Sequence, residues 1–445
     1  MKSRVYRIVT AFGLASLLMF TAASPLLAQM DWVKVTPQYD PKELDSAWGS
    51  VADDPRPEIV ALTPTSGIYA YCWGEEYCLT VIDITNPISP RWVARFDPSG
   101  WPYGLPVSTN FSYAPDAIEG WWVTDNSDPA NPKPVGGYKS IAAVSGVHVS
   151  GQYAFVSEGD GRLAVINISD PASPQRVGEY RGTNDIAAVV VVDKYAYAAA
   201  RGNWDDSLEN SGMIGGGLQV IDISDAANPK RIGWYEYASP YGFMWKVAVA
   251  VRSSYAYVTE SHPRKDDWQG MYLQVIDISN PGNMRRIGSC DFVAGCPGAT
   301  SVTVSGNYAY VAYGAGGGCM CCAPFGVAVI DVSDPASPRR VGGCEIPFPH
   351  PAVDCGNLVV SGDQVYAALG CMVCPFVITE LPAVTRQNIA NGEFTIQWNE
   401  PAKGMKLQRT TSLANPDWQD LLGSENTNAL FLPIWGGSEF FRLAK

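Results

Sequence analysis

The stretch Leu273-Gln-Val-Ile-Asp-Ile-Ser-Asn-Pro281 is one of four close copies of the same phrase in this chain. The other three are Leu163 to Pro171 (LAVINISDP), Leu218 to Asp225 (LQVIDISD) and Val327 to Pro335 (VAVIDVSDP). Anchored on the central valine, seven copies are found, the second and the seventh degenerate, at Val81, Val123, Val165, Val220, Val275, Val329 and Val377. Spacings of 42 to 55 residues between these valines indicate a repeat architecture.

Each copy lies within a unit that predicts four antiparallel strands. An aromatic strand such as Tyr255-Ala-Tyr257 precedes the phrase, and a valine-rich strand such as Val189 to Val192 comes before an aromatic strand, joined to it by a polar two-residue turn. After the phrase, two prolines mark a turn that leads to a short strand such as Arg339 to Gly342. The inner strands are apolar on both faces, so each small sheet must be covered on both sides, as radial packing provides. The sequence predicts an all-β fold, a seven-bladed β-propeller.

The repeated phrase resembles the signature of the LVIVD-repeat family, Leu-x-Val-Ile-Asp-Ile-Ser-Asp-Pro, over roughly residues 59–381. The resemblance implies propeller-like repeats in an exported or surface protein of bacteria or archaea, but no reaction and no catalytic residue. Asn167 and Thr379 stand where the signature has Asp, which indicates that this position belongs to the scaffold. We expect the aspartates of the other copies to cap the turns that follow them.

The N-terminus has the pattern of a secretory signal peptide over residues 1–28. Basic residues precede the apolar run from Ile8 to Phe20, and small residues offer cleavage at Ala28 or Ala23. The run is shorter than the ~20 residues of a membrane span, and no cysteine follows it, so no transmembrane or lipid anchor is expected. The sequence therefore predicts an exported protein, which is periplasmic, cell-surface or extracellular.

Three further segments follow the signal peptide. Residues 29–58 form an N-terminal segment, in which Trp32 to Val35 is an isolated strand pattern. The seventh unit lacks an outer strand, and we expect this N-terminal strand to supply it, because an unpaired edge invites aggregation. The propeller covers residues 59–383. Residues 384–445 carry short alternating patterns that predict a small C-terminal β-sandwich-like module.

Composition and charge exclude several classes. With 47% hydrophobic and 17% charged residues, the chain is not disordered. The 31 Lys and Arg against 44 Asp and Glu leave a net charge of −13, which argues against nucleic-acid binding. Only three histidines, His148, His262 and His350, are present, and no catalytic motif is recognised.

The eleven cysteines are all predicted on one face of the ring, in or beside the loops after the second and fourth strands of the units. In an exported protein, cysteines that close short loops predict disulfides, here Cys72–Cys78, Cys290–Cys296 and Cys344–Cys355. Two Cys-x-x-Cys motifs leave an alternative open. They could bind zinc or copper(I) through Cys319, Cys322, Cys371 and Cys374, with His350 nearby.

The rest of that face is acidic. Glu158 and Asp160 lie in the same class of loop as an acidic set in the fourth and fifth units. Such oxygen ligands could hold calcium, but no Asp-x-Asp-x-Asp-Gly loop is present, and solvated surface loops are the favoured explanation. Tryptophans beside these loops suit glycan or peptide contacts, but they also suit packing between blades. The predicted binding-face residues are Trp204, Asp205, Asp206, Glu209, His262, Asp266, Asp267 and Trp268.

Two functions are consistent with these patterns. The first is an exported interaction protein, a monomeric propeller that presents a cysteine-stapled loop face to a protein, glycan or ion ligand. The second is an extracytoplasmic enzyme with a metal site or a site in the central funnel, since propellers support many chemistries. The scarcity of histidine favours the first.

Overall fold

The computed structural model divides the chain into two compact units, Val35–Ile378 and Met1–Lys34 with Thr379–Lys445. The structure describes residues 33–37, 59–63, 69–73, 79–83, 91–96, 107–108, 110–116, 120–128, 130–142, 144–159, 161–201, 203–205, 212–214, 216–237, 247–264, 267–294, 297–315, 325–346, 355–361, 364–369, 372–380, 384–390, 393–398, 406–410, 417, 419–421, 429–433 and 440–444. Within these residues there are strands and a single 3-10 turn, Pro281–Asn283, and no α-helix. The predicted all-β class is confirmed.

The larger unit is built from small antiparallel sheets that follow one another along the chain. The first sheet contains β2 (Ile59–Thr63), β3 (Tyr69–Trp73), β4 (Leu79–Asp83) and β5 (Arg91–Phe96). The second contains β6 (Val107–Ser108), β7 (Phe111–Asp116), β8 (Gly120–Asp125) and β9 (Lys133–Tyr138). The third contains β10 (Val144–Ser150), β11 (Tyr153–Glu158), β12 (Arg162–Asn167) and β13 (Gln175–Arg181).

The fourth and fifth sheets carry extensions. The fourth contains β14 (Ile186–Val192), β15 (Tyr195–Ala200), β18 (Gly217–Asp222) and β19 (Lys230–Glu236), with the two-stranded sheet β16 (Asn203–Asp205) and β17 (Gly212–Ile214) inserted. The fifth contains β20 (Ala248–Arg252), β21 (Tyr255–Arg264), β22 (Asp267–Asp277) and β23 (Arg285–Ala294). Its strands β21 and β22 are twice the length of β20, so their hairpin extends beyond β20.

The remaining strands of this unit form one eight-stranded sheet in which β1 (Val33–Pro37) lies between β27 and β30. One half contains β24 (Pro297–Ser305), β25 (Tyr308–Ala315), β26 (Phe325–Asp331) and β27 (Arg339–Ile346), and the other half contains β28 (Cys355–Ser361), β29 (Gln364–Leu369) and β30 (Met372–Glu380). The isolated strand predicted near Trp32 is thus present, and it pairs with the strand of the seventh unit that lacked an outer neighbour.

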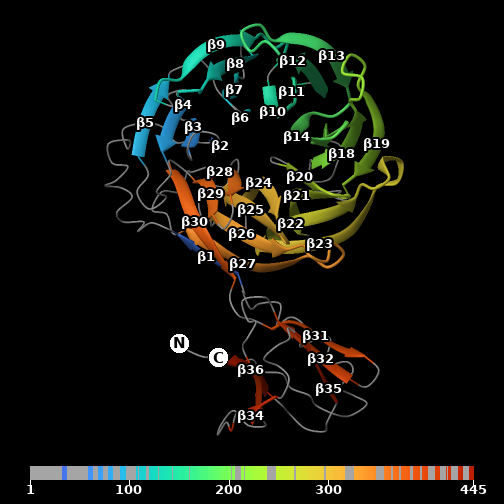
Figure 1. Cartoon of the computed structure of the whole chain (residues 1–445). Coiled ribbons are helices and arrows are strands. Elements are labelled where there is room, and N and C mark those ends of the chain that lie inside the picture. The colour runs from blue at the N-terminus through green and yellow to red at the C-terminus, as the bar shows by residue number, and fades with distance from the viewer. Residues whose placement is uncertain are drawn as a thin grey trace. The chain divides into compact units, whose positions relative to one another are not determined.

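The sheets of the larger unit are arranged around a centre (Figure 1). The strands β2, β6, β10, β14, β20, β24 and β28 are innermost, and β5, β9, β13, β19, β23 and β27 are outermost. Consecutive inner strands contact one another from β10 to β28, β7 contacts β10, and β2 contacts both β6 and β28. Each sheet therefore packs between two neighbours, and we call each boundary between neighbouring sheets a seam.

The hydrophobic core lies in these seams. In the seam between the second and third sheets, Tyr113, Trp121 and Val123 face Ala154 and Ile166, and all five side chains are buried. Trp121 is thus packed between sheets. Packing and ligand contact were the two alternatives that the sequence left open for the tryptophans. The same alternation of faces fills the next seam with Leu163 and Val165 of the third sheet against Ala196 and Ile221 of the fourth. Each fully buried aliphatic side chain contributes about 1.5–3 kcal/mol.

The aspartate of the repeated phrase caps its turn, as predicted. Asp222 Oδ1 accepts from the Ser224 amide at 2.9 Å, and Asp331 Oδ1 accepts from the Ser333 amide at 2.9 Å. Asn167 Oδ1 accepts from the Ser169 amide at the same 2.9 Å, so an amide oxygen replaces the carboxylate without loss of the bond. This explains why the position tolerates asparagine.

A bulge and a glycine in the outer strands complete the repeat. The pairing of β12 with β13 shifts register at Val177, and the pairing of β18 with β19 shifts in the same way at Ile232. A Cβ on the following residue, Gly178 or Gly233, would lie 2.0 Å from a backbone oxygen in the turn of the next sheet. The glycine is required because that turn packs directly on it, and the bulge disrupts the open edge against further pairing.

The smaller unit contains two three-stranded sheets. One has the order β31 (Val384–Ala390), β32 (Glu393–Trp398), β35 (Ala429–Pro433), and the other has the order β34 (Gln419–Asp420), β33 (Lys406–Thr410), β36 (Phe440–Ala444). Leu407 on β33 is fully buried, and Lys406 Nζ lies 2.8 Å from Asp420 Oδ2 across the β33–β34 pair.

Candidate functional site

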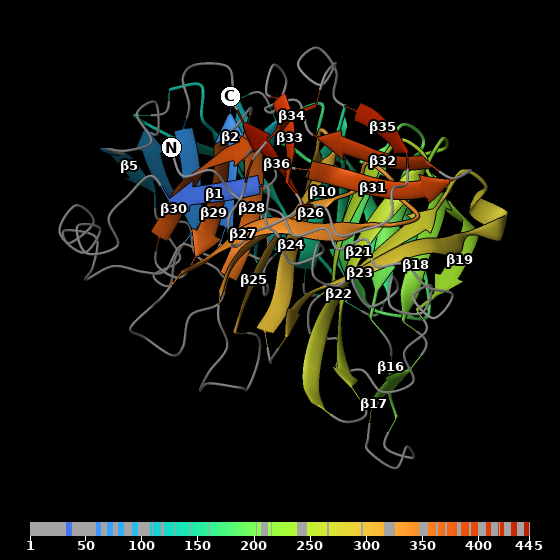
Figure 2. The same cartoon turned by 90° about the horizontal axis from the view of Figure 1, so that it is seen from below.

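Two hairpins project from one side of the larger unit, which we call the loop face (Figure 2). One is β16–β17, inserted between β15 and β18 of the fourth sheet. The other is the outer end of β21–β22 in the fifth sheet, where pairing continues to Arg264↔Asp267. We call these two hairpins the arms. They come from adjacent sheets, since β14 contacts β20.

The arms carry most of the residues that the sequence predicted for binding. Trp204 and Asp205 lie on β16, His262 lies near the end of β21, and Asp267 and Trp268 begin β22. The register pairs Trp204 with Met213 and His262 with Gly270. The remaining predicted residues, Asp206, Glu209 and Asp266, lie outside the described residues, as does Asp160.

The base of the β16–β17 arm is held by contacts to the link between the third and fourth sheets. Arg201, directly after β15, donates its amide to Asp185 O at 2.8 Å, and its Nη1 lies 3.4 Å from Asp185 Oδ2. In the neighbouring sheet, Gly161 adopts a φ of +73° in the β11–β12 turn, and Gly182 donates to Gly161 O at 2.8 Å. The link between the third and fourth sheets thus bonds to the third sheet at one end and to the fourth sheet at the other.

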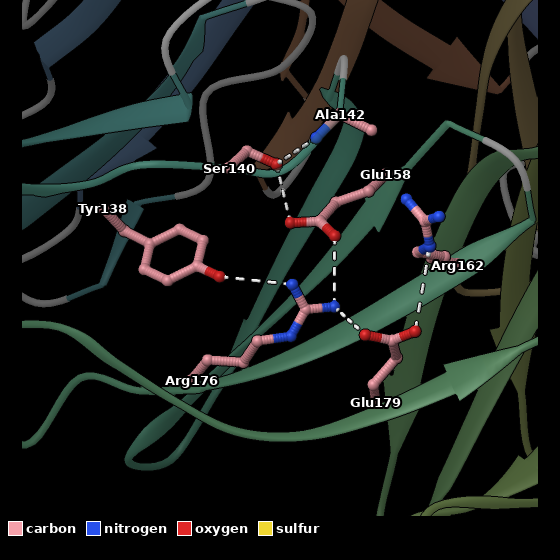
Figure 3. Close-up of polar contacts among 7 residues, drawn as sticks. All are labelled: Tyr138, Ser140, Ala142, Glu158, Arg162, Arg176 and Glu179. Atoms are coloured by element: carbon pink, nitrogen blue, oxygen red, sulfur yellow. Dashed lines mark hydrogen bonds and ion pairs between the residues drawn. The ribbon is translucent and has the colours of Figure 1, made fainter.

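A buried charge cluster lies at the end of the seam between the second and third sheets (Figure 3). Glu158, the last residue of β11, is fully buried. Its Oε1 accepts from Ser140 Oγ at 2.6 Å, and its Oε2 lies 3.2 Å from Arg176 Nη2. Arg176 also contacts Glu179 and donates to the Tyr138 hydroxyl at 3.4 Å. The cluster joins β9 and the link after it to β11 and β13.

Within the cluster, neighbouring groups outweigh the effect of burial on the pKa of Arg176, whereas burial prevails for the pKa of Tyr138. Burial works against the charge of Arg176, but Glu158, Tyr138 and Glu179 together raise the pKa of the guanidinium. Burial raises the pKa of Tyr138, and the hydrogen bond from Arg176 opposes this rise. The cluster therefore holds a fixed ion pair and a neutral phenol. The solvated alternative for Glu158 is wrong, because strand β11 carries its side chain into the seam.

The same seam position is neutral in the next two sheets. Tyr180 on β13 donates to Gln219 Oε1 of the fourth sheet at 2.7 Å, and Tyr235 on β19 donates to Gln274 Oε1 of the fifth at 3.4 Å. In the third sheet, Ala164 occupies the position of these glutamines, and Tyr138 instead accepts from Arg176. Sequence reasoning missed this pairing, although the co-occurrence of tyrosine and glutamine in successive repeats was a readable signal.

Two of the described cysteines, Cys290 and Cys344, lie in outer strands rather than in loops. Cys290 on β23 and Cys344 on β27 occupy the position that Tyr138, Tyr180 and Tyr235 hold in earlier repeats. Cys290 is a buried free thiol, its Sγ lies 3.4 Å from Asp291 O, and burial raises its pKa to about 11. Its predicted partner Cys296 lies outside the described residues, so that disulfide stays a prediction.

The other sulfur ligands and pairs also stay predictions. Cys72 lies on β3 opposite Val60, Cys355 begins β28, and Cys374 lies on β30 opposite Ala367. Cys78, Cys319, Cys322, Cys371 and His350 lie outside the described residues. In the part of the chain that the structure describes, no group of three or more His, Cys, Asp or Glu could hold a metal ion.

His148 is the remaining candidate for acid–base chemistry among the described side chains. It lies on inner strand β10 opposite Phe155, and burial lowers its pKa. The imidazole is therefore neutral near pH 7. Within the same described residues, no helix has the length and apolar character of a membrane span.

Comparison with known families identifies the repeats. A sequence profile described as the LVIVD repeat matches residues 65–97, 143–182, 212–236, 247–292 and 298–345. The chain contains LVIVD repeats. The matched segments include the Asp-capped turns and the bulged outer strands described above, so the signature residues of the LVIVD repeat are those that build its turns and seams. No curated protein sequence matches the chain.

Solved structures similar to this protein establish its fold. The hydrazine synthase of Kuenenia stuttgartiensis aligns with a TM-score of 0.52 at 16% identity, over 71% of this chain and 93% of that chain. The Cps50 (Swd1) β-propeller domain of Myceliophteria thermophila aligns with a TM-score of 0.51 at 11% identity, over 73% and 97%. At these identities the likeness concerns the fold alone, which is that of a β-propeller.

Proposed function

We propose that this chain is an exported, monomeric interaction protein, a seven-bladed β-propeller that binds a protein or glycan ligand on its loop face. The proposal counts the first five sheets and the two halves of the eight-stranded sheet as blades, with β1 as the outer strand of the last blade. Export rests on the signal-peptide pattern of residues 1–28. The small C-terminal module completes the proposed organisation.

The observation that carries the binding proposal is the pair of arms on adjacent sheets. The outer ends of these hairpins extend beyond the strands beside them, so their length needs another explanation. Both arms bear a tryptophan and at least one aspartate, namely Trp204 with Asp205 and Trp268 with Asp267. Aromatic rings and carboxylates are side-chain types that suit contacts with sugars and with peptide side chains.

Disulfides at Cys72–Cys78 and Cys344–Cys355 would further restrain loops on this face, and each would limit the conformations that a ligand must select. A rigid face loses less conformational entropy on binding. Peptide mapping without reduction tests these two links directly, since each predicts one local cross-linked peptide.

The binding proposal is tested with arrays of immobilised glycans and displayed peptides, probed with the full mature chain. Trp204→Ala and Trp268→Ala, alone and together, are expected to abolish any specific signal. Trp234→Ala is the matched control, because Trp234 lies on outer strand β19 and packs with Arg231 at 5.7 Å. A signal that survives the double arm variant, or that is lost equally in the control, overturns the proposal.

A further inference from the structure

The second sheet departs from the repeat on the face that meets the first sheet. On β7 and β8, Tyr113, Trp121 and Val123 face the third sheet. Because side chains alternate along a strand, Ser112 and Thr124 face the opposite way, toward the first sheet, whose strand β2 contacts β6. Asn126, just after β8, continues the same face.

Equivalent positions in the third to sixth sheets are apolar. The backbone N–H of Asn126 donates to the backbone oxygen of Asn110, the residue before β7. In the third to sixth sheets, the same bond to the residue before the aromatic strand is made by the backbone N–H of Ile168, Ile223, Ile278 and Val332. The residues that match Ser112 are Ala154, Ala196, Ala256 and Ala309, and those that match Thr124 are Ile166, Ile221, Ile276 and Ile330. Three neighbouring positions that are apolar in the third to sixth sheets are therefore polar in the second sheet.

These polar side chains are buried as deeply as the apolar ones that they replace. Ser112 is 0% exposed, Thr124 is 1% exposed and Asn126 is 3% exposed. In the described part of the chain, Ser112 Oγ and both Nδ2 and Oδ1 of Asn126 are buried and make no hydrogen bond. A buried polar atom without a partner costs free energy, and ordered water is the usual partner at such sites.

The geometry suits water in particular. Ser112 lies directly opposite Thr124 in the β7–β8 pairing, and Asn126 lies two residues further along the same face. Diagonal neighbours of this kind are separated by roughly 7–8 Å between Cα atoms, within reach of one bridging water between their side chains. A hydroxyl and an amide together offer donors and acceptors, which is what a buried water needs.

We propose that the seam between the first and second sheets holds buried water at Ser112 and Asn126, and that it is the seam at which the ring opens first. Water in place of the Ala and Ile contacts reduces apolar burial in this seam. The free energy of local opening is therefore lower here than in the seam between the third and fourth sheets, where Ala196, Ile221 and Ile223 fill the same positions. The inference concerns the ring itself and is independent of the ligand.

The test restores the repeat in one seam and breaks it in another, in the full mature chain. Ser112→Ala with Asn126→Val supplies the apolar residues of other sheets, valine being the residue found at position 332. The reciprocal control is Ala196→Ser with Ile223→Asn, which transfers the polar pattern to the seam between the third and fourth sheets. Amide hydrogen exchange of residues 111–125 and 186–200 is measured by mass spectrometry for each variant.

The restored variant is expected to slow exchange of residues 111–125 about tenfold and to raise the melting temperature, with residues 186–200 unchanged. The reciprocal variant is expected to speed exchange of residues 186–200 while residues 111–125 exchange as before. The proposal is overturned if the restored variant leaves exchange of residues 111–125 unchanged or faster. It is also overturned if residues 186–200 of the unmodified protein exchange faster than residues 111–125.

Discussion

At the scale of single residues, charge matters most where the repeat buries it. Glu158 has one fixed cationic partner, Arg176, and its other oxygen is bonded to a neutral hydroxyl. A buried carboxylate is tolerated only while its partner remains, because an isolated buried charge cannot be compensated by solvent. The second and third sheets are thus joined by a contact whose two halves depend on each other.

Removing the cation alone should therefore destabilise the protein strongly. Arg176→Met is expected to cost about 3 kcal/mol of unfolding free energy, because Glu158 is left buried and unpaired. The double variant Glu158→Gln with Arg176→Met should cost clearly less. Arg285→Met, which breaks an exposed pair with Asp277 at 3.7 Å, serves as control and should cost less than about 1 kcal/mol. Equal losses in the single and double variants, measured by urea unfolding, would contradict this account.

The turn aspartates make stability sensitive to acid. The hydroxyl and amide of Ser224 lower the pKa of Asp222, and those of Ser279 lower the pKa of Asp277. Since these pKa values are lower in the folded state, the stabilisation is present above the unfolded pKa of about 4 and is lost as pH falls through the lowered values. Asp222→Asn with Asp277→Asn keeps the cap, as Asn167 shows. Its unfolding free energy should fall less between pH 4 and pH 2 than that of the unmodified protein.

The reactivity of the Cys290 thiol distinguishes a disulfide from a buried free thiol. With a pKa of about 11 and 8% exposure, its thiol should resist iodoacetamide at pH 8 in the native protein and react only after unfolding without reductant. Recovery of a Cys290–Cys296 peptide from the unreduced protein would show instead that the sequence-based pairing is correct.

At the scale of elements, β1 bonds to two strand edges at once. It pairs with β30, which has no other outer neighbour, and with β27. On β27, Val341 is fully buried, whereas Val177 and Ile232 at the same position of β13 and β19 are 37% and 38% exposed. The edge that β1 reaches is therefore the better covered one.

Deletion of residues 30–37 should lower the melting temperature by more than about 5 °C and promote aggregation, because it exposes the edges of β27 and β30. A synthetic peptide of residues 31–38 added in excess should recover part of the loss, as strand addition requires. The closure hypothesis fails if the shortened chain melts like the full one.

The elements also show what the sequence could and could not predict. The four strands of each repeat, the capped turn at Asp222 and the added N-terminal strand all followed from local patterns, since period-two alternation and turn residues are local signals. The buried position of Glu158 did not follow, because an acidic residue at a strand end looks the same whether it meets water or an arginine from another sheet. The arms were predicted as loops, since β21 and β22 continue their pairing beyond the repeat without an apolar pattern.

At the scale of the whole molecule, residues Val35–Ile378 form one compact unit, and the C-terminal strands β31 to β36 belong to the other unit. Among the described residues, the clusters that fill the seams of the larger unit consist of residues of that unit. A chain ending at Ala383 should therefore stay soluble and keep the main unfolding transition within about 2 °C in scanning calorimetry, since separate units fold independently. A chain ending at Cys371 is the matched control. It lacks β30, which is part of the eight-stranded sheet, so it should lose the cooperative transition. If the chain that ends at Ala383 is insoluble or melts early, the C-terminal strands contribute to the stability of the larger unit, and the boundary at residues 383/384 is wrong.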